Sequence, residues 1–299
     1  MLIRRKNLLL SFALACMAIT LSVSPAHAKK KETGFLDRSV TIAGTAYRYQ
    51  VFVPDNWTSG KKWPVILFLH GAGERGEDGL VQTEVGIGRA IRLDRSRFPA
   101  IVVMPQCRKD IWWPQSPMDD VAIKSLEEAT KEFHGDTQHT YLTGLSMGGY
   151  GTWYLAGKYP GRFAAIVPIC GGILRPEQAR AQSPDDKSPY SEAAKKIGNH
   201  TPVWIFHGGA DDTVPVTESR RMAEAMKTLM GQETLYAGPH AITTGIAGAE
   251  VLYTEPHASI IAGAEVIYTE YPGVGHNSWD KAYGEHDLIP WLLSKSLPK

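Results

Sequence analysis

Three uninterrupted runs of apolar residues limit most strongly how this chain can fold. They read VILFLH from Val65, AIVVMP from Ala100 and AAIVPI from Ala164. A strand that is apolar on both faces must be covered on both faces, as happens in parallel sheets with helices on either side. The runs therefore predict an α/β protein with these strands at the centre of its sheet.

Further strands and helices are expected around these runs. Apolar residues recur with helical spacing over residues 122–133 and 222–229. With 299 residues, of which 43% are hydrophobic, the chain is long enough for one large core. The segment 174–199 is rich in proline, serine and charge, and we interpret it as an excursion over the sheet edge rather than a second domain. The first two strands, joined around Gly44, should form an antiparallel hairpin. We predict eight strands in one mostly parallel sheet flanked by helices, at residues 39–43, 47–53, 65–70, 100–105, 140–145, 164–169, 203–207 and 266–270.

The first 28 residues have the features of a secretory signal rather than of a folded domain. Residues 4–6 are basic, residues 8–23 are mostly apolar, and Ala26-His27-Ala28 is a small-x-small cleavage site. The apolar run is short for a membrane-anchoring helix, and a lipoprotein signal built on Cys16 is an alternative. We expect cleavage at this site, a mature domain at 29–299, a secreted or periplasmic location, and no membrane span after cleavage.

The charge balance favours no macromolecular partner. Lys and Arg total 32 against 31 Asp and Glu, which gives a formal net charge of +1. Neither nucleic acid nor an anionic membrane surface is therefore indicated.

Export would leave Cys107 and Cys170 in the mature chain. An oxidising compartment permits a disulfide between them, and two free buried thiols are the alternative.

The pentapeptide Gly144-Leu145-Ser146-Met147-Gly148 follows a predicted strand and opens a helical segment. This is the context that a G-x-S-x-G nucleophile turn requires. The turn is so tight that its flanking positions must lack side chains, which explains the two glycines. Ser146 is then raised above the strand ends, and the helix N-terminus behind it favours developing negative charge. We identify Ser146 as the candidate nucleophile, against the alternative of a glycine-rich turn with an incidental serine.

A nucleophilic serine needs a base, and the base needs an acid that orients it. With this turn, the acid and then the histidine follow the serine along the chain, each after a later strand. The stretch VWIFHGGADDTVPV offers Asp211 and Asp212. We choose Asp211 because of its H-G-x-x-D-x-x-V-P spacing, and expect Asp212 to face solvent or to cap the next helix. His207 is expected to be a packing residue at the strand end.

The candidate base is His276, in a Gly-flanked loop after the last predicted strand. The sequence that leads to it is written almost twice, because IAGAEVLYTE begins at Ile246 and IAGAEVIYTE at Ile261. The second copy runs into the His276 loop, so we expect it to form the last strand. The region 240–260 is then an apparent duplicated insertion, and His257 is a by-product of the duplication.

An acyl-transfer site also needs backbone N–H groups aimed at the developing oxyanion, each worth roughly 3–4 kcal/mol. One candidate is the N–H of Met147, directly after the serine. The other is the N–H of Ala72, in the loop His70-Gly71-Ala72-Gly73, which His70 should brace. The glycines do not have the spacing of a dinucleotide or phosphate loop, and no group of His, Cys and carboxylates has metal-site spacing. We therefore expect neither a cofactor nor a metal.

Three tryptophans are candidate substrate-binding residues. Trp112 and Trp113 follow the fourth predicted strand, and Trp279 comes just after His276. Loops at these positions should rim the site, and aromatic rims suit aryl or sugar-linked acyl groups. The alternative is that these large side chains only pack the loops onto the core.

Five stretches of the chain together carry a family resemblance. LHGAGERG, GLSMGGYGTWYLAGKYP, PICGG, HGGADDTVPV and YTEYPGVGHNSWD resemble secreted bacterial α/β-hydrolases close to feruloyl esterases and polyhydroxyalkanoate depolymerases. Similar chains are also known as dienelactone-hydrolase-like "predicted peptidase" proteins. The resemblance runs from about residue 39 to the C-terminus. It implies the α/β-hydrolase fold and gives Ser146, Asp211 and His276 the roles assigned above, but it does not fix the substrate.

The sequence thus predicts a secreted serine carboxylic-ester hydrolase that acts through an acyl-enzyme. Its substrates would be small-molecule or polysaccharide-linked esters, with aryl and sugar-linked esters as candidates. A serine peptidase acting on small peptides would use the same residues and is one alternative. A non-catalytic polymer-binding protein with a hydrolase-like shell is another, and the complete set of candidate catalytic residues argues against it.

Overall fold

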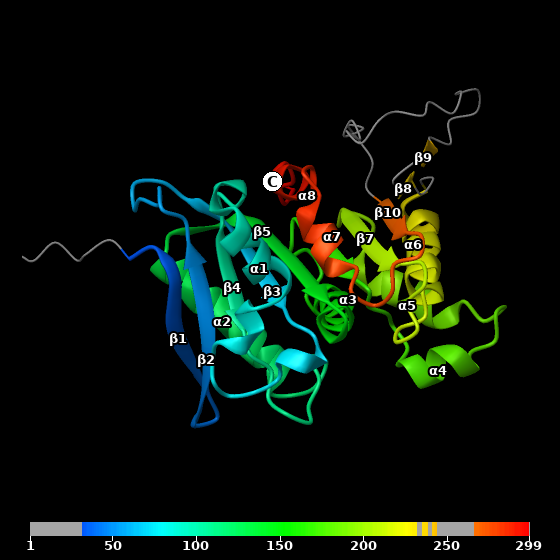
Figure 1. The fold of residues 1–299 in the computed structure, drawn as a ribbon, viewed down its shortest axis with the longest axis horizontal. Coiled ribbons are helices and arrows are strands. Elements are labelled where there is room, and N and C mark those ends of the chain that lie inside the picture. The colour runs from blue at the N-terminus through cyan, green and yellow to red at the C-terminus, as the bar shows by residue number, and fades with distance from the viewer. Residues whose placement is uncertain (1–31, 232–234, 239–240, 244–265, 299) are drawn as a thin grey trace, which may run out of the picture. The chain divides into compact units, whose positions relative to one another are not determined.

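The computed structural model of the chain describes residues 32–231, 235–238, 241–243 and 266–298 (Figure 1). The part from Glu32 onward forms one compact unit. The expected signal peptide at 1–28, the first copy of the repeat and His257 lie outside the described residues. Within the described part, no helix combines the length and apolar character that a membrane crossing needs.

The described strands form one ten-stranded sheet with the order β1-β2-β4-β3-β5-β6-β7-β10-β8-β9 (Figure 1). The first two form an antiparallel hairpin, and β2 pairs antiparallel with β4. Neighbouring strands are parallel from β4 across to β8. All eight predicted strands are present, and the predicted fold class is confirmed. The strands are β1 (Gly34–Ile42), β2 (Thr45–Val53), β3 (Trp63–Leu69), β4 (Ile101–Pro105), β5 (Gly135–Leu145), β6 (Ala165–Ile169), β7 (Val203–Gly208), β8 (Leu235–Gly238), β9 (Ala241–Thr243) and β10 (Val266–Tyr271).

Two of these strands were not predicted. β8 pairs in parallel with β10, and β9 pairs antiparallel with β8, so both extend the sheet beyond the last predicted strand. The strand that leads to His276 is β10, which comes from the second copy of the repeat and pairs along its whole length with β7. This pairing sets the point at which the chain leaves the sheet toward His276.

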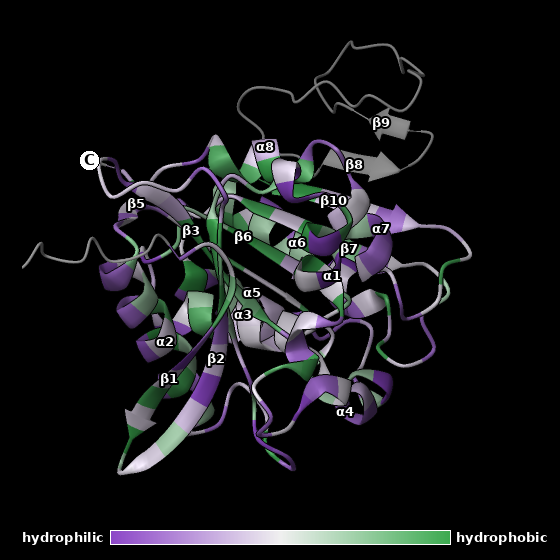
Figure 2. Cartoon of the chain, turned by 60° about the vertical axis from the view of Figure 1, so that its left-hand side comes forward, coloured by the Kyte–Doolittle hydropathy of each residue, from purple (hydrophilic) through white to green (hydrophobic). Residues whose placement is uncertain are grey.

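Helices lie on both faces of the sheet, and the side chains of the central strands alternate between two core clusters. In β3, Val65, Leu67 and Leu69 belong to one cluster, and Ile66 and Phe68 belong to the other. Figure 2 shows apolar residues gathered on these inner strands. The continuous apolar runs of the sequence are therefore explained by burial on both faces. The first cluster is covered by α2 (Met118–Glu132), α3 (Met147–Lys158), α5 (Ser188–Ile197) and α6 (Thr217–Met230), and the second by α1 (Gly86–Leu93), α7 (Trp279–Gly284) and α8 (Leu288–Leu293).

The segment 174–199 differs from its interpretation as an excursion over the sheet edge. It contains two helices, α4 (Pro176–Ala181) and α5, and α5 packs against both α3 and α6. Tyr190 and Ile197 on α5 are buried in the first core cluster. Its high content of charged residues reflects the exposed face of α5, while its few apolar residues complete a helical layer.

Candidate active site

Ser146 lies between the end of β5 and the first turn of α3. Its backbone has φ 51° and ψ −118°, a conformation that few non-glycine residues adopt. The N–H of Ser146 donates to the carbonyl of Ile169 at 2.9 Å, which ties the turn to the end of the neighbouring strand β6. The strained backbone is held by structure on both sides, as is common at functional sites.

Two glycines allow this turn to pack against its neighbours. A Cβ atom on Gly144 would lie 2.3 Å from the carbonyl oxygen of Gly148, and one on Gly148 would lie 1.9 Å from the carbonyl oxygen of Leu69. Both contacts are with backbone atoms, which cannot move aside as a flexible side chain can. The close approach of α3 to the end of β3 therefore requires glycine at these positions.

The structure brings Ser146, His276 and Asp211 into one hydrogen-bonded chain. Nε2 of His276 lies 2.8 Å from Oγ of Ser146, and Nδ1 of His276 lies 2.7 Å from Oδ2 of Asp211. The three residues come from loops after β5, β7 and β10. Along the chain, His276 follows Ser146 by 130 residues and Asp211 by 65 residues. Because a carboxylate can only accept, Nδ1 carries the proton and Nε2 presents its lone pair to the serine hydroxyl.

Asp211 is held as a buried carboxylate. Its Oδ1 accepts the backbone N–H groups of Thr213 and Val214, each at 2.9 Å, and its side chain is fully buried. Burial by itself would raise the pKa of Asp211, but hydrogen bonds from His207, His276 and the N–H of Val214 outweigh it and hold the pKa far below its ordinary value. Asp211 therefore stays charged beside His276, while Asp212 is exposed.

His207 has a closer relation to the site than its expected packing role. It is fully buried, and its Nε2 lies 3.1 Å from Oδ2 of Asp211. The same nitrogen lies 3.1 Å from the carbonyl oxygen of Val214, and Nδ1 lies 2.7 Å from Oγ of Ser219. The spacing H-G-x-x-D contained the signal for this contact, because it places a histidine at a strand end four residues before the carboxylate.

The loop after β3, which contains the candidate oxyanion donor Ala72, lies against the serine. A Cβ atom on Gly71 would be 3.6 Å from Cβ of Ser146. His70 braces this loop, since its Nε2 accepts the N–H of Cys107 at 2.9 Å and its Nδ1–H donates to the carbonyl of Gly71 at 2.6 Å. Burial lowers the pKa of His70 to about 4, so the ring is neutral near pH 7.

The bond from His70 also sets the direction of the Ala72 N–H. The carbonyl of Gly71 and the N–H of Ala72 belong to one peptide unit, and in a trans peptide these two groups point in opposite directions. Because His70 holds the carbonyl, the N–H of Ala72 is turned away from His70. The other candidate donor is the N–H of Met147, which is the first residue of α3 and directly follows Ser146. The first N–H groups of a helix have no intrahelical partner.

The three tryptophans have different environments. Trp279 lies beside the candidate base, with its ring centroid 5.5 Å from that of His276 in a perpendicular arrangement. Trp112 is half-buried, with the guanidinium of Arg175 4.8 Å from its ring centroid. Trp113 is fully buried, and its indole N–H donates to the carbonyl of His70 at 2.9 Å. The expectation that Trp113 binds substrate is therefore corrected: it packs the loop from inside, as the alternative had it.

A second unpredicted residue supports the loop after β6. Glu218 is fully buried on α6, and its carboxylate accepts the N–H groups of Ile173 at 2.7 Å and Leu174 at 2.9 Å, as well as the hydroxyl of Tyr190. A Cβ atom on Gly172 would lie 2.5 Å from this carboxylate. The sequence offered no signal for it, because a glutamate in the first turn of a helix is usually exposed.

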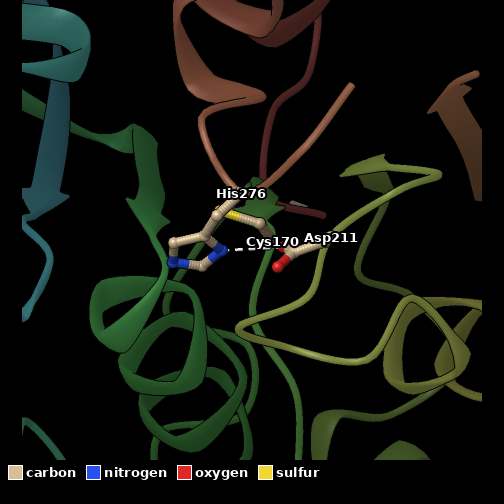
Figure 3. Close-up of side chains that lie close together, drawn as sticks. All are labelled: Cys170, Asp211 and His276. Carbon is tan, nitrogen blue, oxygen red and sulfur yellow. Dashed lines mark hydrogen bonds and ion pairs between the residues drawn. The ribbon is translucent and has the colours of Figure 1, made fainter. Parts of the chain in front are cut away.

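Cys170 lies next to Asp211 and His276, and the three offer possible metal-ligand atoms within 4.8 Å of one another. Figure 3 shows the bond between His276 and Asp211, with Cys170 beside them. Burial raises the pKa of the Cys170 thiol to about 12, so it is not the thiolate that binds metals. The near oxygen of Asp211 already accepts N–H groups from both histidines. The donor set therefore fits a hydrogen-bonded acid–base pair better than a metal centre. Cys107 and Cys170 are both free and buried.

Comparison with known proteins identifies a family. The model of the family described as "Putative esterase" matches residues 39–237, which is more than half of the chain. The matched range contains Ser146 and Asp211 and ends before His276. Poly(3-hydroxyalkanoate) depolymerase C of Paucimonas lemoignei is 26% identical over 155 residues, which cover 45% of this chain and 37% of that protein. The chain therefore spans less than half the length of this curated relative.

Two solved structures have a similar fold. A thermostable esterase aligns with a TM-score of 0.65 and 28% identity, over 88% of this chain and 63% of its own. The feruloyl esterase module from Clostridium thermocellum, solved in complex with sinapinate, aligns with a TM-score of 0.56 and 18% identity, over 86% of this chain and 87% of its own. At this lower identity the likeness concerns the fold alone.

Proposed function

This chain belongs to the esterase family whose model it matches, and from that premise we propose that it hydrolyses carboxylic esters through an acyl-enzyme on Ser146. The observation that carries the proposal is the hydrogen-bonded chain from Ser146 through His276 to Asp211, with distances of 2.8 and 2.7 Å. A serine hydroxyl that faces the unprotonated nitrogen of an imidazole, itself oriented by a buried carboxylate, meets the requirements of acyl transfer.

In the proposed mechanism, Oγ of Ser146 forms a bond to the ester carbonyl carbon while Nε2 of His276 takes the hydroxyl proton. Asp211 stabilises the resulting imidazolium and keeps its orientation. His276 then gives the proton to the alcohol oxygen as the ester C–O bond breaks, which leaves the acyl group on Ser146. Water repeats the sequence with His276 as base, and the acid is released.

The charge that develops on the carbonyl oxygen would be stabilised by the N–H groups of Ala72 and Met147. The loop of Ala72 lies against Ser146, and His70 fixes its orientation through the carbonyl of Gly71. Donors that are already oriented cost no reorganisation during the reaction, and losing one typically slows turnover by about a hundredfold or more. No cofactor takes part in the proposed steps.

For the substrate, we propose esters with an aryl or sugar-linked group. Support comes from Trp279, whose ring stands beside that of His276, and from the half-buried Trp112. Flat aromatic side chains at the edge of a site offer apolar contact area to rings of either kind. Whether the substrate is a polysaccharide-linked ester or a small free ester is tested by comparing how fast the protein hydrolyses one ester of each kind.

The test is hydrolysis of 4-nitrophenyl acetate by the chain from Lys29. Ser146→Ala and His276→Ala are each expected to lower kcat roughly a thousandfold or more. Ser96→Ala, at an exposed serine whose hydroxyl donates to Asp94 at 2.6 Å, serves as the matched control and should keep the full rate. Far-UV circular dichroism checks that each variant is folded.

Each other outcome has a definite meaning. An intact Ser146→Ala protein with the wild-type rate would refute the proposal. A wild type that cleaves small peptide amides but no ester would favour the peptidase alternative. A wild type that is inert and does not react with a fluorophosphonate at Ser146 would favour a non-catalytic binding protein.

We further propose that residues 1–28 direct export and are removed. Expression in a bacterial host, followed by mass spectrometry of the exported protein, should find an N-terminus at Lys29. A protein that keeps its first 28 residues in the cytoplasm would contradict this.

A further inference from the structure

Arg75 places a positive charge next to the candidate oxyanion donor Ala72. It follows the short 3-10 helix Ala72–Glu74 in the loop after β3, and its Nε donates to the carbonyl oxygen of Ala72 at 3.0 Å. This loop lies against the nucleophile, since a Cβ atom on Gly71 would be 3.6 Å from Cβ of Ser146. Ala72 therefore offers its N–H as the candidate oxyanion donor and holds the guanidinium through its carbonyl.

The guanidinium of Arg75 lies beside the oxyanion position rather than in it. In a helical turn, the N–H and the carbonyl of one residue point in opposite directions along the turn. Arg75 is thus suited to bind a substituent of an ester and not to stabilise its carbonyl oxygen. Its charge is nevertheless close to this loop: burial is the main cause that lowers the pKa of His70, and the charge of Arg75 lowers it further.

The charge of Arg75 has no counter-ion among the residues that the structure describes. The three acidic residues nearest to it in the loop are oriented elsewhere. Glu77 pairs with Arg108 at 2.6 Å, and Asp78 accepts two backbone N–H groups at 2.6 and 2.8 Å. Glu74 turns its Oε2 into the interior, where that atom is buried. A cation next to the candidate site is therefore left for a ligand to neutralise.

The guanidinium is fixed at one edge and open at the other. The bond to Ala72 uses Nε, whereas neither Nη1 nor Nη2 has a hydrogen-bond partner in the described part of the chain. Both nitrogens are accessible from solvent, and the side chain as a whole is half-buried. Two N–H groups in a planar fork match the two oxygens of a carboxylate, and partial burial strengthens such a pair. The open edge of Arg75 therefore has the geometry of a carboxylate-binding group.

We propose that Arg75 binds a carboxylate of the substrate, so that the preferred esters carry a negative charge on their acyl or their alcohol part. This inference rests on the proposed function and narrows its substrate class. The carboxylate accepts N–H groups from Nη1 and Nη2 while the ester carbonyl faces Ser146 and the N–H of Ala72. Arg75 is then a specificity-determining residue, because it holds a part of the substrate that does not react.

The experiment compares esters of the same shape that differ in charge. 4-Acetoxybenzoate carries a carboxylate on its alcohol part, and 4-acetoxybenzamide is its neutral counterpart. Monomethyl terephthalate and methyl 4-carbamoylbenzoate form the matching pair for the acyl part. In at least one pair, the chain from Lys29 is expected to hydrolyse the charged ester with a kcat/KM about tenfold higher. The pair that shows the preference identifies the part of the ester that faces Arg75.

Two variants of Arg75 separate recognition of charge from support of the loop. Arg75→Gln removes the charge and keeps an N–H donor as many bonds from the backbone as Nε, so it can still hold the carbonyl of Ala72. It is expected to lower the ratio of the two kcat/KM values about tenfold, and Arg75→Lys, which keeps the charge without the fork, should retain part of the preference. A purely structural role would slow both esters equally and leave the ratio in place.

Arg162→Gln is the matched control. The guanidinium of Arg162 pairs with Glu127 at 2.9 Å, four residues beyond the end of α3 that is opposite to Ser146. This variant removes the same charge far from the candidate site and should leave the ratio of kcat/KM values unchanged.

Binding is measured separately, so that failure of this inference and failure of the proposed function can be told apart. The amide analogues of the same esters, in which N–H replaces the ester oxygen, are titrated into Ser146→Ala protein by ligand-observed NMR. The charged analogue should bind about tenfold more tightly than the neutral one, and adding Arg75→Gln should remove the difference.

Each result has a definite meaning. Equal kcat/KM values within both pairs, or a preference that survives Arg75→Gln, would overturn the inference and leave ester hydrolysis in place. Equal affinities of the charged and neutral analogues would also overturn it. If no ester is hydrolysed but the charged analogue still binds more tightly through Arg75, the proposed function fails while the carboxylate site stands.

Discussion

His207 and Asp211 are joined inside the protein, with Nε2 of the histidine 3.1 Å from Oδ2 of the carboxylate. That oxygen is the one that also accepts Nδ1–H of His276 at 2.7 Å. His207 is itself fixed by Ser219, whose hydroxyl lies 2.7 Å from Nδ1. One oxygen of the Asp211 carboxylate thus accepts hydrogen bonds from both the buried His207 and the candidate catalytic His276.

Removing His207 should alter activity through Asp211. His207→Leu is expected to lower kcat about tenfold, because a hydrogen bond to a charged group, worth about 1.5–3 kcal/mol, no longer orients the carboxylate. The pH at which the folded protein loses stability in acid should also rise, since a carboxylate with one hydrogen-bond donor fewer takes up a proton more readily.

His207→Gln keeps a side-chain donor and is the control, expected to recover part of the rate and of the stability in acid. A merely structural role for His207 would lower the unfolding midpoint in both variants by the same amount at every pH.

The lowered pKa of Asp211 predicts a loss of stability in acid. A carboxyl whose pKa is lower in the folded state stabilises that state above its ordinary pKa of 3.8, and this contribution is lost as the pH falls below that value. Asp211→Asn should therefore lower the thermal midpoint near pH 7, and its difference from wild type should shrink as the pH falls from about 5 to about 2. Asp212→Asn, at the exposed neighbour, should follow wild type at every pH. If the difference in thermal midpoint between Asp211→Asn and wild type stayed the same at every pH, the lowered pKa of Asp211 would be contradicted.

Glu218 should be important for stability. Glu218→Ala leaves the N–H groups of Ile173 and Leu174 and the hydroxyl of Tyr190 without their acceptor, and is expected to cost about 3 kcal/mol in urea unfolding. Glu224→Ala, on the same helix, removes an exposed pair with Lys187 and should cost less than about 1 kcal/mol. Equal costs for the two variants would refute the role given to Glu218.

Gly148 should not tolerate a side chain. Alanine is favoured over glycine in a helix by about 1 kcal/mol, but a Cβ atom here would lie 1.9 Å from the carbonyl oxygen of Leu69. Gly148→Ala is therefore expected to destabilise the chain by about 4 kcal/mol or more, or to prevent folding. Gly60→Ala, where nothing lies within 4 Å, should stay within about 0.5 kcal/mol of wild type. An intact, stable Gly148→Ala protein would show that α3 can move away from β3.

Cys107 and Cys170 should both be unreactive in the folded protein. Burial raises the pKa of Cys107 and of Cys170 to about 12, so neither is a thiolate at pH 8. A thiol reagent such as 5,5′-dithiobis(2-nitrobenzoate) is expected to react with neither in the native chain from Lys29, and with both after unfolding in guanidinium chloride without reductant. If unfolding releases no thiol, the cysteines are paired.

The strands and the candidate catalytic residues could be predicted because their signals are local. VILFLH and AIVVMP are apolar throughout, since strands at the centre of a sheet are covered on both faces. Ser146, Asp211 and His276 each lie in a short pattern next to a predicted strand, and the structure brings all three together. The strands β8 and β9 were missed, because they are only 4 and 3 residues long and exist through pairing at the edge of the sheet.

The sequence by itself therefore determined the α/β fold, the positions of the eight predicted strands along the chain and the three residues of the hydrogen-bonded chain. Only the tertiary structure decided that His207 shares the carboxylate of Asp211, that Trp113 is buried behind His70, and that Glu218 is buried beneath the loop after β6. The physical reason is the range of the interactions. Apolar periodicity and tight turns are written in neighbouring residues, whereas burial, shared hydrogen bonds and cavities arise where segments far apart in the chain pack together.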